Sequence, residues 1–187
     1  MMNSLYECEL CPRNCLADRS YVEGYCRSGL EIKISSWDLH FGEESCLSGT
    51  RGSGTIFFTN CNLRCVFCQN HTISQSGIGN QISTEDLVEI ILKLQDLGAH
   101  NINLVTPTHF SSQLQKVLIK AKDQGLEIPV IWNSNAYEKV ETLKQMVELV
   151  DIYLSDLKYL SPEIAARYSD AGDYPQFATA AVLEMHN

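Results

Sequence analysis

The sequence has no long apolar run and little positive charge, and these absences argue against two classes of partner. No stretch of about 18 or more apolar residues occurs, so no membrane-spanning helix is expected. Of the 187 residues, 14 are Lys or Arg and 23 are Asp or Glu, which gives a net charge of −9. Binding to nucleic-acid phosphates needs clustered basic residues, so no nucleic-acid partner is expected either.

The amino-terminal residues also lack the features of a secretory leader. The start, MMNSLYECEL, has neither a basic region nor the apolar run that follows it in a signal peptide. We therefore expect a cytoplasmic protein. The chain has no internal repeat or low-complexity segment, and its length allows one sizeable core with a small appendage.

Cysteine, in contrast, is abundant. In a reducing compartment, closely spaced cysteines more often hold metal or perform redox chemistry than form disulfides. Seven of the eight cysteines fall into two groups, which are Cys8, Cys11, Cys15 and Cys26, and then Cys61, Cys65 and Cys68. Cys46 stands alone between them and is expected to be a buried or incidental thiol.

From about residue 55 the chain alternates between strand and helix patterns. Apolar and β-branched runs predict strands at 55–60, 101–107, 128–133 and 150–159. Caps and apolar faces predict helices at 83–98, 111–125 and near 138–148. This alternation predicts right-handed βαβ units and therefore an α/β fold with a parallel sheet. We expect a cysteine-rich metal-binding segment over residues 1–50 and the α/β domain over residues 51–187.

The three-cysteine loop, CNLRCVFCQN, has no fourth ligand beside it. Polar neighbours such as Asn62 and Arg64 disfavour a helix that merely buries three small thiols. Zinc with a fourth ligand such as His71 or an amino-terminal cysteine is one interpretation. The other is an iron–sulfur cluster in which one iron keeps an open position, since a [4Fe–4S] cluster usually takes four thiolates.

The C-x3-C-x2-C spacing directly after the first predicted strand, with Phe67 before the last cysteine, resembles the signature of the radical S-adenosylmethionine (SAM) superfamily. GSGTIFFTNCNLRCVFCQN, NINLVTPTHF and DIYLSDLKY together resemble the branch related to pyruvate formate-lyase activating enzymes. The resemblance implies a partial parallel βα barrel with a [4Fe–4S] cluster on Cys61, Cys65 and Cys68. It also implies that SAM chelates the open iron and yields a 5′-deoxyadenosyl radical that abstracts hydrogen from a substrate.

The same resemblance implies cofactor contacts at the ends of the predicted strands. Lys158 would pair with the carboxylate of SAM and Asp156 would help hold its ammonium, although the two could also form a solvated surface pair. Asn133 and Asn135 would bind polar atoms of the cofactor, or serve only as turn residues. Phe67 would contact the adenine, or pack within its own loop.

Two features depart from the family pattern. The Gly-Gly-Glu element that receives the amino group of SAM is absent, and TPTH stands in its place. Thr106, Thr108 and His109 are therefore the candidates for that contact. His109 could instead face the substrate, or simply be packed or hydrogen-bonded to solvent, as a lone histidine more often is. The second departure is length, because the chain supplies about four βα units where the family usually has six, so the barrel is expected to be short at its carboxyl end.

The amino-terminal cysteines satisfy either a closed zinc site or a second, electron-relaying cluster, and their spacing does not separate these. The family resemblance implies two partners, which are an electron donor such as a flavodoxin or ferredoxin and a protein substrate such as a glycyl-radical enzyme. The competing hypotheses are a non-catalytic zinc or iron–sulfur binding module and a truncated cluster-binding fragment without activity.

Overall fold

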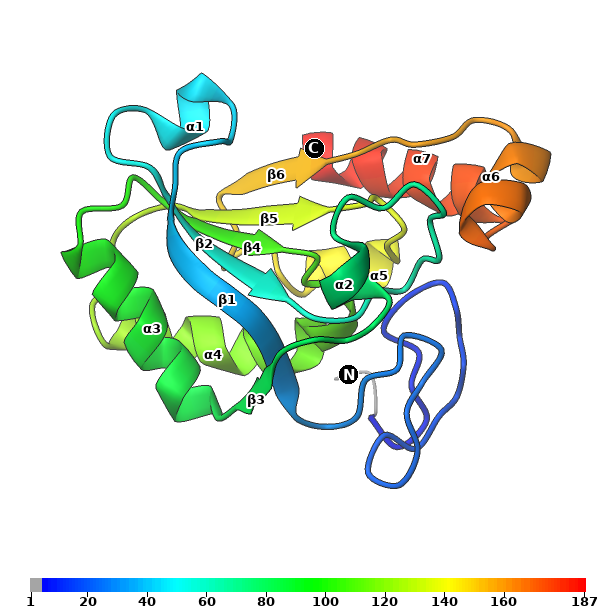
Figure 1. The fold of residues 1–187 in the computed structure, drawn as a ribbon, viewed down its shortest axis with the longest axis horizontal. Coiled ribbons are helices and arrows are strands. Elements are labelled where there is room, and N and C mark those ends of the chain that lie inside the picture. Colours follow the sequence, from blue (N-terminus) through cyan, green and yellow to red (C-terminus); the bar gives the residue numbers. More distant parts are fainter. Residues whose placement is uncertain (1–4) are drawn as a thin grey trace.

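The centre of the fold is one six-stranded sheet, and the computed structural model describes residues 5–187 (Figure 1). The strands are β1 (Ile32–His40), β2 (Ser53–Phe58), β3 (Asn80–Ile82), β4 (Ile102–Val105), β5 (Val130–Ser134) and β6 (Ile152–Ser155). Their order is β3-β1-β2-β4-β5-β6, so the sheet is open. Strands β2, β4, β5 and β6 are parallel, while β1 is antiparallel to both β2 and β3. The expected α/β class and partial parallel barrel are confirmed.

The four predicted strands correspond to β2, β4, β5 and β6. Strand β6 ends at Ser155, so Asp156 and Lys158 follow the strand instead of lying inside the run predicted at 150–159. No strand was expected before residue 55, yet β1 pairs with β2 along most of its nine residues. The sheet therefore uses residues from both sides of residue 50.

Helices α3 (Thr84–Asp96) and α4 (Ser111–Asp123) confirm two predictions, and the Ser83 hydroxyl caps α3 by accepting a hydrogen bond from the backbone N–H of Asp86. The third predicted helix is shorter, since α5 spans only Val140–Lys144. Helices α6 (Pro162–Ser169) and α7 (Tyr174–His186) were not predicted. The remaining helical turns are α1 (Ser45–Ser48), α2 (His71–Ser74) and the 3-10 turn η1 (Thr108–Phe110).

The main core lies between the sheet and the helix pair α3 and α4, which cover one face (Figure 1). Ile56, Leu104 and Trp132 are neighbours across three strands and all three are fully buried there. Because side chains alternate along a strand, the neighbouring row of Phe57, Val105 and Asn133 points to the opposite face. This second row lines the cavity described below.

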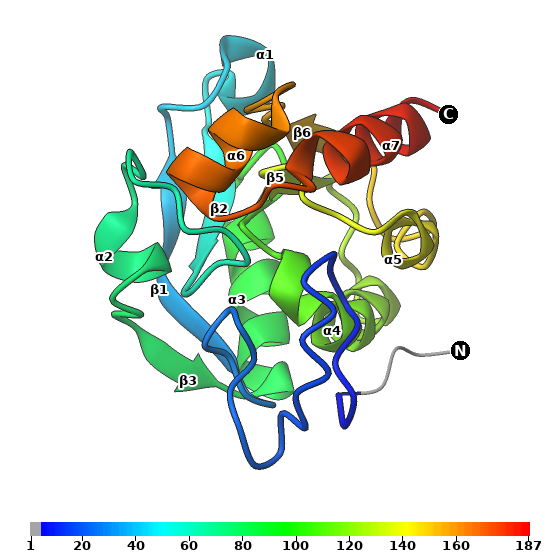
Figure 2. The ribbon, with the colours of Figure 1, turned by 90° about the vertical axis from the view of Figure 1, so that its right-hand side faces the viewer.

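A second cluster of apolar residues joins the cysteine loop to the carboxyl-terminal helices. Cys61, Leu63 and Cys65 pack in it with Tyr159 and Tyr174. Helices α6 and α7 follow β6 and lie near this edge strand of the sheet (Figures 1 and 2). None of the helices in the described part of the chain has the length and apolar character needed to span a bilayer.

Residues 5–31 form no helix or strand and are attached to the sheet by specific hydrogen bonds. Arg13 Nε donates to the backbone oxygen of Asn62 at 2.8 Å, inside the cysteine loop. Arg19 Nη1 donates to the backbone oxygen of His109 at 2.6 Å. The cysteine-rich segment is thus held against the carboxyl ends of β2 and β4.

Candidate metal centre and cofactor cavity

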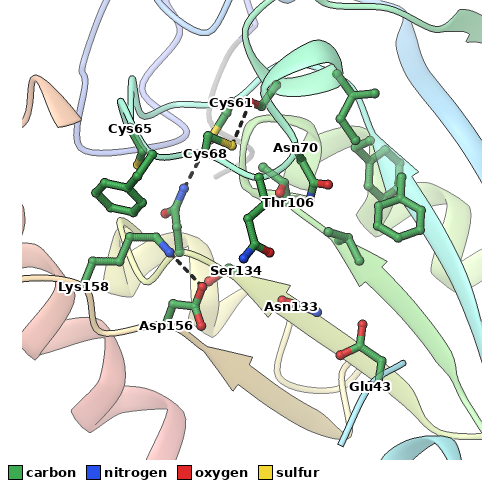
Figure 3. Close-up of a pocket in the computed structure, with 18 of the residues that line it drawn as sticks. Glu43, Cys61, Cys65, Cys68, Asn70, Thr106, Asn133, Ser134, Asp156 and Lys158 are labelled. Carbon is green, nitrogen blue, oxygen red and sulfur yellow. Dashed lines mark hydrogen bonds and ion pairs between the residues drawn. The ribbon is translucent and has the colours of Figure 1, made fainter. Parts of the chain in front are cut away.

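Cys61, Cys65 and Cys68 lie together on the loop that follows β2, and all three line one cavity of about 560 Å³ (Figure 3). Cys61 and Cys65 are buried and Cys68 is half-buried. The loop turns sharply at its start, where Asn60 has a φ of 69° and its side-chain amide donates to the backbone oxygen of Arg27 at 2.9 Å. The geometry thus brings three thiols to one open space.

The thiols are held in a poorly hydrated environment that favours their neutral form. Burial raises the pKa of Cys61 to about 12, and the nearby Cys65 and Cys68 raise it further, while the backbone N–H of Leu63 opposes the change. Burial also raises the pKa of Cys65, against the hydrogen bond from Ser169 and the charge of Lys158. Because a metal binds the thiolate, loading this site must release protons.

Polar groups from the ends of three further strands face the same cavity. Thr106 follows β4, Asn133 and Asn135 lie at the end of β5, and Asp156 and Lys158 follow β6. Figure 3 shows the cysteines on one side of the cavity and Lys158 with Asp156 beside them. The sequence expectation that these strand ends meet is matched by the structure, as it should be for parallel strands.

The individual contacts show how these groups are fixed. Asn135 Nδ2 donates to Asn62 Oδ1 at 3.0 Å and lies 3.3 Å from Cys61 Sγ. Lys158 Nζ lies 2.8 Å from Asp156 Oδ2, and the side chain of Lys158 is 21% exposed against 72% for Asp156. The cavity therefore holds a half-buried cation close to the thiols, together with amide groups that can both donate and accept hydrogen bonds.

Left-handed backbone recurs at these strand ends. Asn60, Thr106 and Ala136 have φ values of 69°, 60° and 62°, and they follow β2, β4 and β5 within two residues. The conformation is unfavourable for residues with a Cβ, and for a β-branched threonine it is a genuine outlier. Such strain concentrates at functional sites, where surrounding structure compensates for it.

Two predicted cofactor contacts lie away from this cavity. Thr108 is fully buried and its hydroxyl donates to Glu138 Oε1 at 2.6 Å. His109 is also buried, and its Nε2 donates to the backbone oxygen of Thr59 at 2.8 Å. Burial lowers the pKa of His109 to about 3, so this imidazole is neutral. Both side chains are engaged in holding the strand ends together.

The amino-terminal cysteines form a second group, which the structure also brings together. Cys8, Cys11 and Cys26 are buried and Cys15 is half-buried. Burial is the largest cause that raises the pKa of Cys8, and the charges of Cys15 and Cys26 raise it as well. A Cβ built on Gly24 would lie 3.0 Å from Cys15 Sγ and 3.7 Å from Cys26 Sγ, so the chain passes tightly around these thiols.

Neither group is arranged as a site for a single metal ion. Across residues 5–187, no three side chains of His, Cys, Asp or Glu are placed to hold one ion. Cys46 is exposed at α1 and lies outside both groups. His71, the candidate fourth ligand for zinc, is exposed and does not line the cavity.

Several residues of the cavity were not anticipated from the sequence. His40 at the end of β1 and Glu43 in the segment after it line the cavity, and Glu43 Oε1 accepts from the side-chain amide of Asn103 at 2.9 Å. Ser74 on α2 lines the cavity as well, and Ser169 at the end of α6 contacts Cys65. No local motif marks these residues, because they reach the site through a strand and helices that were not predicted.

Comparison with known proteins agrees with this geometry. The family model described as the Radical SAM superfamily matches residues 55–186, which is more than half of the chain. An uncharacterized protein of Methanocaldococcus jannaschii is 36% identical over 182 residues, which cover 92% of this chain and 51% of the relative.

Two activating enzymes are more distantly similar. The pyruvate formate-lyase 1-activating enzyme of Escherichia coli (strain K12) is 22% identical over 113 residues, 58% of this chain and 46% of the relative. The pyruvate formate-lyase-activating enzyme of Listeria monocytogenes is 25% identical over 117 residues, 58% of this chain and 47% of the relative. The chain thus spans about half the length of the curated relatives that it matches.

Proposed function

Because the chain belongs to the radical SAM superfamily, we propose that Cys61, Cys65 and Cys68 hold a [4Fe–4S] cluster whose fourth iron binds SAM. The observation that carries this proposal is that three thiols and the polar ends of three other strands line one cavity. The donor set fits the group, since thiolates are the preferred ligands of iron–sulfur clusters and three of them leave one iron open. When bound, the reduced cluster supplies the electron that cleaves SAM and so generates the radical that abstracts hydrogen from a substrate.

The residues of the cavity have distinct proposed roles toward SAM. Lys158 pairs with its carboxylate, and the oxygens of Asp156 and Thr106 accept from its ammonium. Asn133 and Asn135 bind the ribose or other polar atoms, because amides can both donate and accept. Phe67 offers its ring to the adenine; the ring is exposed on the cavity rim, 6.3 Å from the ring of Tyr159.

We propose that the amino-terminal cysteines bind a second metal group, either zinc or an iron–sulfur cluster. Zinc would require these thiols to draw closer together than they lie in the described residues, where no three are placed to hold one ion. The support is that four thiols converge within a short segment that has little other regular structure. In this proposal residues 1–50 contribute a metal-binding segment and also strand β1 of the sheet, and residues 51–187 supply the parallel strands of the partial barrel. A reducing cytoplasm is the compartment that suits free thiols of both groups.

The substrate class follows the activating-enzyme relatives. We propose a hydrogen atom on a protein, such as a glycine of a glycyl-radical enzyme, as the target. The electron donor would be a low-potential carrier such as a flavodoxin or ferredoxin. A deuterium-labelled substrate tests the assignment, since hydrogen abstraction must transfer the label into 5′-deoxyadenosine.

A product assay tests the proposed function. The protein is purified and reconstituted without oxygen, and iron, sulfide and 5′-deoxyadenosine are measured after reduction with dithionite in the presence of SAM. We expect product from the wild type and from Cys46→Ala, whose thiol lies outside both groups, and none from Cys65→Ala. Zinc as the only bound metal, with no product, would show instead a non-catalytic binding module. A loaded cluster without product would show a fragment that binds but does not react.

A further inference from the structure

Each thiol of the three-cysteine loop has its own side-chain partner, supplied by a different part of the chain. Ser169 Oγ donates to Cys65 Sγ at 2.9 Å. Ser74 Oγ lies 3.1 Å from Cys68 Sγ, and Asn135 Nδ2 lies 3.3 Å from Cys61 Sγ. The partners come from α6, α2 and the end of β5.

The contact to Cys65 is the shortest of the three and it is extended by a second hydroxyl. Ser169 is fully buried, and Tyr159 Oη lies 2.7 Å from its Oγ. A serine hydroxyl carries one proton. Since that proton is directed at the sulfur, the phenol of Tyr159 must donate to the serine oxygen. Tyr159, Ser169 and Cys65 thus form a directional chain in which each hydrogen bond polarises the next.

The backbone holds this chain in place. Ser169 is the last residue of α6, and its carbonyl oxygen accepts from the N–H of Arg64 at 3.2 Å, while the N–H of Val66 donates to Tyr168 O at 2.9 Å. The end of α6 is therefore fastened to the loop on both sides of Cys65. The hydroxyl of Ser169 is preorganised and does not need to be recruited when a metal binds.

We propose that Ser169, oriented by Tyr159, is a positioning residue that stabilises negative charge on the Cys65 thiolate and so raises the reduction potential of the cluster. The inference rests on the proposed function. One-electron reduction adds one negative charge to the cluster and its thiolates, and a donated hydrogen bond favours the more negative state. The electron comes from an external low-potential reductant. No proton is transferred, and the O–H bond of Ser169 stays intact.

The test is a redox titration of the reconstituted protein without SAM, with dithionite as the reductant and electron paramagnetic resonance as the readout. We expect Ser169→Ala to shift the midpoint potential to a more negative value and Tyr159→Phe to shift it in the same direction by less. Iron content should equal that of the wild type in both variants. Ser111→Ala is the matched control, because Ser111 is a buried serine on α4 whose hydroxyl has no partner among the described residues. The midpoint potential of the cluster in this variant should equal that of the wild type.

The outcomes separate this inference from the proposed function. A loaded wild type whose midpoint potential is unchanged in Ser169→Ala and in Tyr159→Phe overturns the inference alone. If Ser169→Ala does not fold or load, Tyr159→Phe decides, because it keeps the serine and removes only the group that orients it. A wild type that takes up no iron overturns the proposed function and this inference with it.

Discussion

Lys158 forms an ion pair with Asp156 and also lines the cavity beside the cysteine loop. Its Nζ is 2.8 Å from Asp156 Oδ2, and its charge partly opposes the burial that raises the pKa of Cys65. An exposed ion pair alone contributes under about 1 kcal/mol. A cation that lines the cavity beside the thiols can in addition pair with the carboxylate of a bound cofactor.

We predict that Lys158→Ala weakens SAM binding about ten- to hundredfold, since a hydrogen bond to a charged group contributes about 1.5–3 kcal/mol. Iron content should stay the same. The measurement is a titration of the reconstituted protein with SAM. Lys120→Ala is the control, because Lys120 forms a comparable ion pair with Glu85 at 2.6 Å on helices α4 and α3. Equal affinity in the two variants would contradict the role given to Lys158.

Glu138 is a buried carboxyl group outside the cavity, and burial raises its pKa to about 7, although Thr108 and Trp132 donate to its Oε1. Because the pKa of Glu138 is higher in the folded than in the unfolded protein, the folded protein binds the proton of this carboxyl group more tightly. The stability that this group contributes is therefore fully present below about pH 4.5 and is lost as the pH rises through about 7.

We predict that Glu138→Gln increases the free energy of unfolding at pH 8 by about 1–2 kcal/mol relative to the wild type, because an amide keeps the acceptor oxygen and carries no buried charge. At pH 5 the two proteins should be nearly equal. Urea denaturation at both pH values measures this. A gain of the same size at pH 5 would argue against ionisation of Glu138 as the cause.

At the scale of elements, the sequence predicted the strands and helices whose own pattern determines them. Residues 55–60 form a short apolar run, and 83–98 carry a cap and one apolar face, so both are recognisable without tertiary contacts. Strand β1 begins with two buried isoleucines, Ile32 and Ile34, but continues with partly buried and exposed residues past an irregular register, so it is defined by its pairing with β2. Helix α7 has apolar and small residues on several faces, which hides its period.

The candidate site divides in the same way. The side chains that lie at or just beyond the carboxyl ends of predicted strands are brought together by the parallel topology; they are the three cysteines, Thr106, Asn133, Asn135, Asp156 and Lys158. Ser169 depends on α6 and was therefore missed. Thr108 and His109 are next to Thr106 in the sequence, but the 3-10 turn η1 directs them into the protein, where Glu138 and the Thr59 carbonyl bind them.

Arg13 connects the amino-terminal segment, the cysteine loop and the end of α6. Its guanidinium stacks 3.8 Å from the ring of Tyr25 and donates to backbone oxygens of Asn62 and of Asp170, which follows α6. We predict that Arg13→Ala destabilises the protein by about 1–3 kcal/mol and speeds hydrogen exchange in residues 5–31. Arg13→Lys should not restore the wild-type rate, because a single ammonium cannot reproduce the planar fork. Unchanged exchange in the alanine variant would contradict this linking role.

At the scale of the whole molecule, the amino-terminal cysteine group and the three-cysteine loop lie close together at the carboxyl ends of the parallel strands. Asn62 lies between the two groups. Burial raises the pKa of Cys11 to about 12, and a hydrogen bond from the Asn62 side chain opposes this change. Asn135 joins the same Asn62 to Cys61. The two groups are thus separated by a few hydrogen-bonded amides.

We predict that the two groups nevertheless load independently. Cys26→Ser should remove the metal of the amino-terminal group and leave the three-cysteine cluster in place, because the ligand sets share no residue. Metal analysis with electron paramagnetic resonance distinguishes the groups. Simultaneous loss of both metals in a variant that remains folded by circular dichroism would show that they form one site.

If the three-cysteine loop presents an iron with an open position, as we propose, the cluster on this loop must respond to SAM. The reduced, reconstituted protein is examined by electron paramagnetic resonance before and after addition of SAM. We predict a cluster signal that changes when SAM is added and that is absent in Cys65→Ala. A signal that is lost in Cys65→Ala but does not respond to SAM would mean that all irons of this cluster are already ligated by the protein, and there would be no open position.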